Sequence, residues 1–146
     1  MINRFAAANH WVRALRAADF NDSKACLEHI NRYIDLRGGK AKALALRGRC
    51  SVSLERNRDA LRDFEQVVRQ LDPSAKLTKD AKYILAYCKK WIAVIHGAPE
   101  ADIEDLIQRA LAIDASARVK DYLPLATGYY EKRWKPSLVR SKLDCG

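Results

Sequence analysis

Residues that break helices are scarce in this chain of 146 amino acids. It has six glycines and four prolines, and no proline precedes Pro73. A chain with so few helix breakers favours long helices, because glycine weakens helix interiors and proline interrupts them. Sustained alternation of apolar and polar residues between turn signals, the pattern of strands, is also missing. The sequence therefore predicts an all-α fold.

Long apolar runs are missing as well, since none approaches the ~20 residues that a membrane-spanning helix needs. Hydrophobic residues make up 49% and charged residues 31% of the chain, a balance typical of one globular domain over residues 1–146. The first 18 residues carry three arginines and no acid, as mitochondrial presequences do. We interpret this segment as the first structural helix and expect a cytoplasmic protein, with a mitochondrial location as the alternative.

Signs of catalysis or metal binding are lacking too. None of the four cysteines lies in a CxxC pair, and the three histidines are isolated from one another in the sequence. No GxSxG, Walker or GxGxxG motif occurs. We therefore expect a non-enzymatic protein without catalytic residues, metal or cofactor, whose internal cysteines are buried thiols.

Apolar periodicity and turn signals predict seven helices followed by a short C-terminal segment. Phe5, Val12 and Leu15 are expected on the apolar side of the first helix. A seventh helix, which Ser116 can cap, contains Pro124 and is therefore expected to kink or break near Leu123. The first six expected helices cover about residues 3–18, 23–37, 40–55, 58–71, 78–96 and 100–113.

Three helical runs end alike, in Ile34-Asp35, Leu71-Asp72 and Ile113-Asp114. The intervals between these pairs are 37 and 42 residues. Self-similarity at such a period is typical of stacked helical hairpins, each of which buries its apolar face against its neighbours. The alternative is an antiparallel bundle built by the same packing rules.

The segment around residues 43–73 resembles a tetratricopeptide repeat (TPR). Gly48 and Ala60 match the small residues through which the two helices of a repeat pack, Phe64 matches the aromatic of the second helix, and Leu-Asp-Pro at 71–73 matches the repeat terminus. The neighbouring repeats are degenerate, and residues 125–134 suggest a fourth first helix. The resemblance implies a right-handed α-solenoid of antiparallel hairpins with about three and a half TPR-like repeats.

Charge alternates along the predicted helices. The four segments 3–18, 40–56, 76–96 and 116–135 together carry +14, whereas the three segments between them total −5. In the TPR family the first helix of each hairpin lines the concave surface, so the resemblance implies a basic groove. Such a groove attracts anionic partners. The predicted partner-binding residues on the first three of these helices are Arg13, Lys42, Arg49, Lys82 and Lys89.

These patterns predict a scaffold or adaptor that binds an acidic peptide or protein surface in the basic groove. Contact with RNA or DNA through the same surface is the first alternative, because the sequence pI is near 9.6. A structural subunit of a larger assembly, docking through the aromatic segment 129–134, is the second. The sequence leaves the oligomeric state open.

Overall fold

The computed structural model describes residues 2–74 and 76–125. The expected fourth first helix, the aromatic segment 129–134 and the C-terminal segment lie outside these residues. The described part is all-helical, without strands, so the prediction of an all-α fold is confirmed there. Its helices are α1 (Ile2–Asp19), α2 (Ser23–Arg37), α3 (Ala41–Ser53), α4 (Asn57–Leu71), α5 (Lys79–Ile95), α6 (Glu100–Leu111) and α7 (Ala117–Tyr122).

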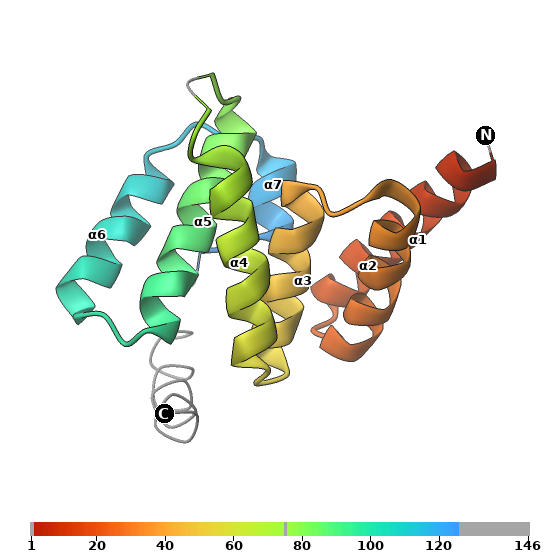
Figure 1. The fold of residues 1–146 in the computed structure, drawn as a ribbon, viewed down its shortest axis with the longest axis horizontal. Coiled ribbons are helices and arrows are strands. Elements are labelled where there is room, and N and C mark those ends of the chain that lie inside the picture. Colours follow the sequence, from red (N-terminus) through yellow and green to blue (C-terminus); the bar gives the residue numbers. More distant parts are fainter. Residues whose placement is uncertain (1, 75, 126–146) are drawn as a thin grey trace.

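Helices that follow one another in the sequence also pack against one another in space, from α1 and α2 through to α5 and α6. Figure 1 shows this row, with α1 near one end and α6 at the other. The short helix α7 breaks the order, since it returns to contact α1 rather than extending the row beyond α6. This return places the end of α7 within hydrogen-bonding reach of α3 and α5.

Short polar side chains start several of these helices. The Asp22 carboxylate accepts a hydrogen bond from the Ala25 amide at 3.1 Å, and the Thr78 hydroxyl accepts one from Ala81 at 3.1 Å. Both bonds satisfy N–H groups of a first helical turn that have no partner within the helix. At the other end of α2, Gly38 adopts a φ of 87°, which glycine reaches without a Cβ clash.

The side of α1 that packs on α2 differs from the prediction. Phe5 and Val12 are 76% and 51% exposed, so their expected place on the packed side of this helix is wrong. The buried side of α1 instead carries a stripe of alanines, Ala7, Ala14 and Ala18. Such small residues allow two helix backbones to approach closely, and the contact between α1 and α2 is extensive.

The contact between α3 and α4 depends on a glycine. A Cβ added at Gly48 would lie 2.4 Å from Cε1 of Phe64, whose ring is fully buried. Ala60, which the resemblance paired with Gly48, is fully buried as well. At the edge of the same contact, Arg47 Nε and Nη2 donate to the two Asp63 carboxylate oxygens at 2.8 and 2.9 Å. The close packing and the paired hydrogen bonds together fix α3 against α4.

Gly48→Ala is expected to destabilise the protein. The added methyl overpacks the ring of Phe64, which costs about 1–3 kcal/mol, and the gain in helix propensity of about 0.5–1 kcal/mol offsets only part of this. Chemical denaturation measures the free energy of unfolding. Gly39→Ala is the matched control, because its Cβ would meet Leu44 at an ordinary 3.4 Å. A Gly48→Ala protein as stable as the wild type would contradict this account of the packing.

Candidate functional site: the inner face and its pocket

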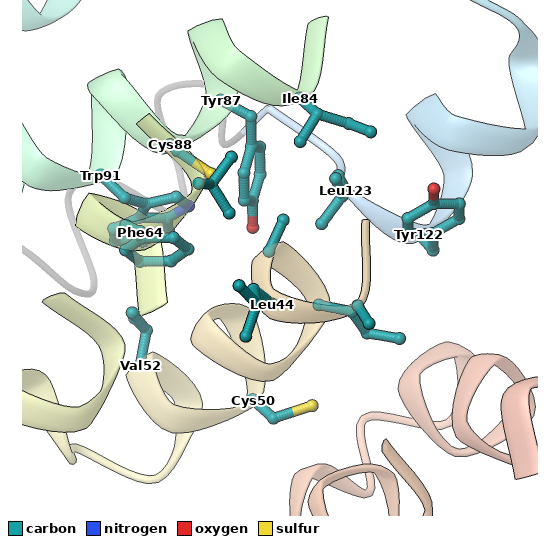
Figure 2. Packing of buried hydrophobic residues seen from close by; sticks show 14 of the residues in the cluster. Leu44, Cys50, Val52, Phe64, Ile84, Tyr87, Cys88, Trp91, Tyr122 and Leu123 are labelled. Carbon is teal, nitrogen blue, oxygen red and sulfur yellow. The ribbon is translucent and has the colours of Figure 1, made fainter. Parts of the chain in front are cut away.

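The end of α7 is held by side chains from two other helices. The backbone carbonyl of Tyr122 accepts a hydrogen bond from Arg49 Nη1 at 2.8 Å, and the carbonyl of Leu123 accepts one from the Tyr83 hydroxyl at 2.7 Å. The last carbonyls of a helix have no hydrogen-bond donor within it, so Arg49 and Tyr83 supply donors that the helix itself lacks. Leu123 itself is fully buried and points into the core beside Ile84 and Tyr87 (Figure 2).

The start of α7 is tied to α5. Ser116 caps the helix, and its own backbone N–H and hydroxyl donate to the two carboxylate oxygens of Asp80 at 2.8 and 2.9 Å. Both ends of a six-residue helix are therefore anchored by side chains from elsewhere. A helix this short is not stable alone, so these contacts hold it in place.

Aromatic rings connect α7 to the first hairpin. The Trp11 ring lies 5.2 Å from that of Tyr33 and 5.3 Å from that of Tyr122, in tilted and edge-to-face arrangements. Lys42 Nζ lies over two of these rings, 4.7 Å from the Trp11 centroid and 5.9 Å from the Tyr33 centroid. These are the distances of cation–π contacts. We call the side of α1, α3 and α5 marked by Trp11, Lys42, Arg49, Tyr83 and Tyr87 the inner face.

A pocket remains open beside α7 on the inner face. It has an interior volume of about 70 Å³, enough for a small polar group or a few waters. Among the described residues that line it, Arg49 carries a charge and the others are neutral. Tyr87 and Trp91 form the apolar side, and Pro124 and Leu125 form the edge toward α7. The remaining lining residues are Ala18, Asn21, Ser23, Cys50, Val52 and Ser53.

The five predicted site residues divide into three groups. Lys42 and Arg49 lie together on the inner face, where Lys42 contacts the aromatic rings and Arg49 holds α7. Lys82 is exposed, and Lys89, seven residues along the same helix, forms an ion pair with Asp72 at 3.0 Å. Arg13 follows Trp11 by two residues, so it points about 200° away from that ring and away from the inner face. The structure thus brings together two of the five residues and separates the others from them.

The sequence reasoning missed Tyr83 and Tyr87, the residues of α5 that mark the inner face. They lie four residues apart, as residues on one side of a helix do, and Trp91 follows after four more. Lys90 is fully buried, with Nζ 3.8 Å from the Trp91 ring centroid. Lys82 and Lys89 were predicted from the positive charge of this helix, but the aromatic residues identify its packed side.

The cysteines in and near this site, Cys26, Cys50 and Cys88, are buried free thiols. Burial raises the pKa of the Cys88 thiol, and a hydrogen bond with Cys26, together with burial, raises the pKa of the Cys50 thiol in the pocket wall. The thiolate is the nucleophilic form, so neither group is activated for catalysis. Among residues 2–74 and 76–125 no group of three or more His, Cys, Asp or Glu side chains gathers as metal ligands do.

A second cleft, between α2, α3 and α4, is strongly polar. Arg47, Arg56, Arg62, Asp59 and Asp63 line it, so charges of both signs are present. The Arg47–Asp63 ion pair uses part of this charge, and Arg47 Nη1 also donates to Asn31 of α2 at 3.1 Å. We interpret this cleft as a structural junction between three helices.

The chain matches no protein-family model, no curated protein and no solved structure in comparisons with each. No helix in the described part of the chain combines the length and the apolar character that crossing a membrane requires. The geometry of the inner face is therefore the basis on which a function can be assigned.

Tyr83→Phe is expected to loosen α7. The change leaves the buried Leu123 carbonyl without its side-chain donor, and an unsatisfied buried carbonyl costs about 1–3 kcal/mol. Hydrogen exchange measures the result, as faster exchange of the Lys120 and Leu123 amides, which bond within α7.

Tyr122→Phe is the control, because its ring contact with Trp11 is kept and its backbone carbonyl is unchanged. Equal protection of α7 in the wild type and in Tyr83→Phe would show that the Leu123 contact does not hold the helix.

Proposed function

We propose that this protein is a non-enzymatic scaffold or adaptor that binds an acidic peptide or protein segment on the inner face. The observation that carries the proposal is the pocket in which, among the lining residues that the structure describes, Arg49 is charged and the others are neutral. A carboxylate placed there meets a guanidinium without competition from an acidic side chain of these residues. The proposal includes the TPR-like solenoid, in which the inner face is the concave surface of the array.

Arg49 has the donors to serve two roles. A guanidinium carries five N–H groups, and the bond to the Tyr122 carbonyl uses Nη1. That bond also orients the guanidinium, so less conformational entropy is lost when a carboxylate binds. Tyr87 and Trp91 offer apolar surface beside it, as binding pockets for peptide side chains do.

The extent of the site is smaller than the charge pattern suggests. α7 covers the inner face next to Trp11 and Lys42, and Lys42 Nζ rests on the rings of Trp11 and Tyr33. We therefore assign the primary contact with the acidic partner to Arg49 and its pocket. Lys42 contributes by the electrostatic attraction of its positive charge. Lys82 is exposed on α5 and contributes by attracting an anionic partner at longer range.

Arg49→Gln is expected to weaken binding of a short peptide rich in Asp and Glu by about tenfold or more, the usual effect of removing one charge-assisted hydrogen bond. Titration calorimetry at low ionic strength measures the affinity. Arg58→Gln, which removes an exposed base from α4, is the control and is expected to change the affinity by less than about twofold.

A second variant separates binding from the anchoring of α7. Ser53→Phe places a ring in the pocket and keeps Arg49 and its bond to Tyr122, so it is expected to weaken the peptide while α7 stays protected from hydrogen exchange. If Arg49→Gln and Arg58→Gln weaken the peptide equally, the pocket is not the site. Tighter binding of single-stranded nucleic acid than of the peptide would favour the nucleic-acid alternative instead.

A further inference from the structure

Arg13 belongs to a second basic cluster, on the other side of the first hairpin. His10 of α1 and His29 of α2 face each other there, with their Nδ1 atoms 3.1 Å apart and their ring centroids 5.4 Å apart. Each histidine is followed three residues later by an arginine, Arg13 on α1 and Arg32 on α2. Residues three apart lie one turn apart on the same side of a helix.

The direction of the two helices makes this cluster nearly symmetric. The turn at Asn21 and Asp22 sends α2 back along α1, so Arg32 lies toward the start of α1 and Arg13 toward its end. The two imidazoles therefore lie between two guanidinium groups. In the part of the chain that the structure describes, neither arginine forms an ion pair, in contrast to Arg47 and Arg109.

The electrostatics of the cluster are one-sided. The pKa of His10 is lowered, by burial first and then by the positive charge of His29, Arg32 and Arg13. Glu28 is the acid of α2 that lies closest to the cluster in sequence, four residues before Arg32, and no ion pair joins the two in the described residues. The facing Nδ1 atoms are within hydrogen-bond distance, and which ring donates depends on the tautomer.

We propose that His10, Arg13, His29 and Arg32 form a binding site for a tetrahedral oxyanion of charge −2, such as a phosphomonoester. Oxygens of one anion accept hydrogen bonds from both imidazoles and both guanidinium groups, and its charge balances cations that otherwise repel. The site is separate from the pocket at Arg49, so this inference does not depend on the proposed function.

A divalent metal fits the same two histidines less well. The Nδ1 separation suits two ligands of one metal ion, but the pair supplies two protein ligands where structural and catalytic zinc sites have three or four. Arg13 and Arg32 add two positive charges that repel a metal cation. The same charges attract an anion, so the residues around the two histidines favour an anion over a metal ion.

Binding is expected to take up protons. The anion stabilises the protonated imidazoles and so raises the pKa of His10 from its lowered value. Affinity therefore rises as the pH falls toward the range in which the free site titrates. Sulfate tests this directly, because it keeps its charge of −2 across this range. A phosphomonoester loses charge near its second pKa of about 6, so its affinity is expected to pass through a maximum.

The experiment follows the imidazole carbon-bound protons of His10 and His29 by NMR in the full chain, during titration with sodium sulfate and with inorganic phosphate at constant ionic strength. A saturable shift is expected, at lower sulfate concentration at pH 6 than at pH 8. Arg13→Gln/Arg32→Gln is expected to raise the required concentration about tenfold or more, because two charged donors are lost. Arg16→Gln/Arg37→Gln, which removes one exposed base from each of the same helices, is the charge-matched control.

Three outcomes would overturn the site. One is the absence of a saturable shift at sulfate concentrations up to on the order of 10 mM, beyond the range of even weak specific binding. Another is an equal loss of affinity in the two double variants, which would show that net charge and not this cluster attracts the anion. The third is a shift produced by zinc ions alone, which would make the pair a metal site. Phenyl phosphate in place of inorganic phosphate tells whether a monoester is accepted.

Discussion

Two hydrogen bonds to the end of α7 decide what the inner face can do. Arg49 and Tyr83 donate to consecutive backbone carbonyls, those of Tyr122 and Leu123, and thereby hold a short helix against α3 and α5. Because both acceptors are backbone oxygens, these two bonds do not depend on the side chains of Tyr122 and Leu123. The helix covers part of a surface that would otherwise be open, and the pocket beside Arg49 is the part left accessible.

Part of the positive charge on α3 and α5 is paired with acids within the molecule. Arg47 is paired with the buried Asp63, Lys89 with Asp72 and Lys79 with Asp114. The last two pairs are exposed, and such pairs contribute about 0–1 kcal/mol each, so they orient helices more than they stabilise them. Charge counted along a sequence therefore overstates the charge that a partner meets. Arg49 stands out because it reaches both the pocket and the backbone of α7.

The sequence predicted the local features of the fold well. The helix that begins after Ser116 and its break near Leu123 are confirmed, because each follows from the chemistry of one or two neighbouring residues. The packed side of α1 was assigned wrongly, since Phe5 and Val12 are more hydrophobic than the alanines that α2 contacts. Hydrophobicity alone does not show where close approach of two backbones favours a small residue.

The candidate site was less predictable than the fold. Lys42 and Arg49 were placed on one helix side by their spacing, and the structure finds them on the inner face. The contact between Arg49 and Tyr122 joins residues 73 positions apart, and no local pattern indicates it. The facing histidines, His10 and His29, are likewise isolated in the sequence and meet through the turn between α1 and α2.

The most direct test of the central claim is an isotope-filtered NMR experiment on the complex with an Asp- and Glu-rich peptide. It detects a peptide proton and a protein proton that lie less than about 5 Å apart. This limit is close to the distance at which side chains are in packing contact. The pocket assignment predicts contacts from the peptide to the Val52 methyls and the Trp91 ring, which line the cavity beside Arg49. Contacts confined to the exposed side of α1 around Phe5, with none to Val52 or Trp91, would contradict it.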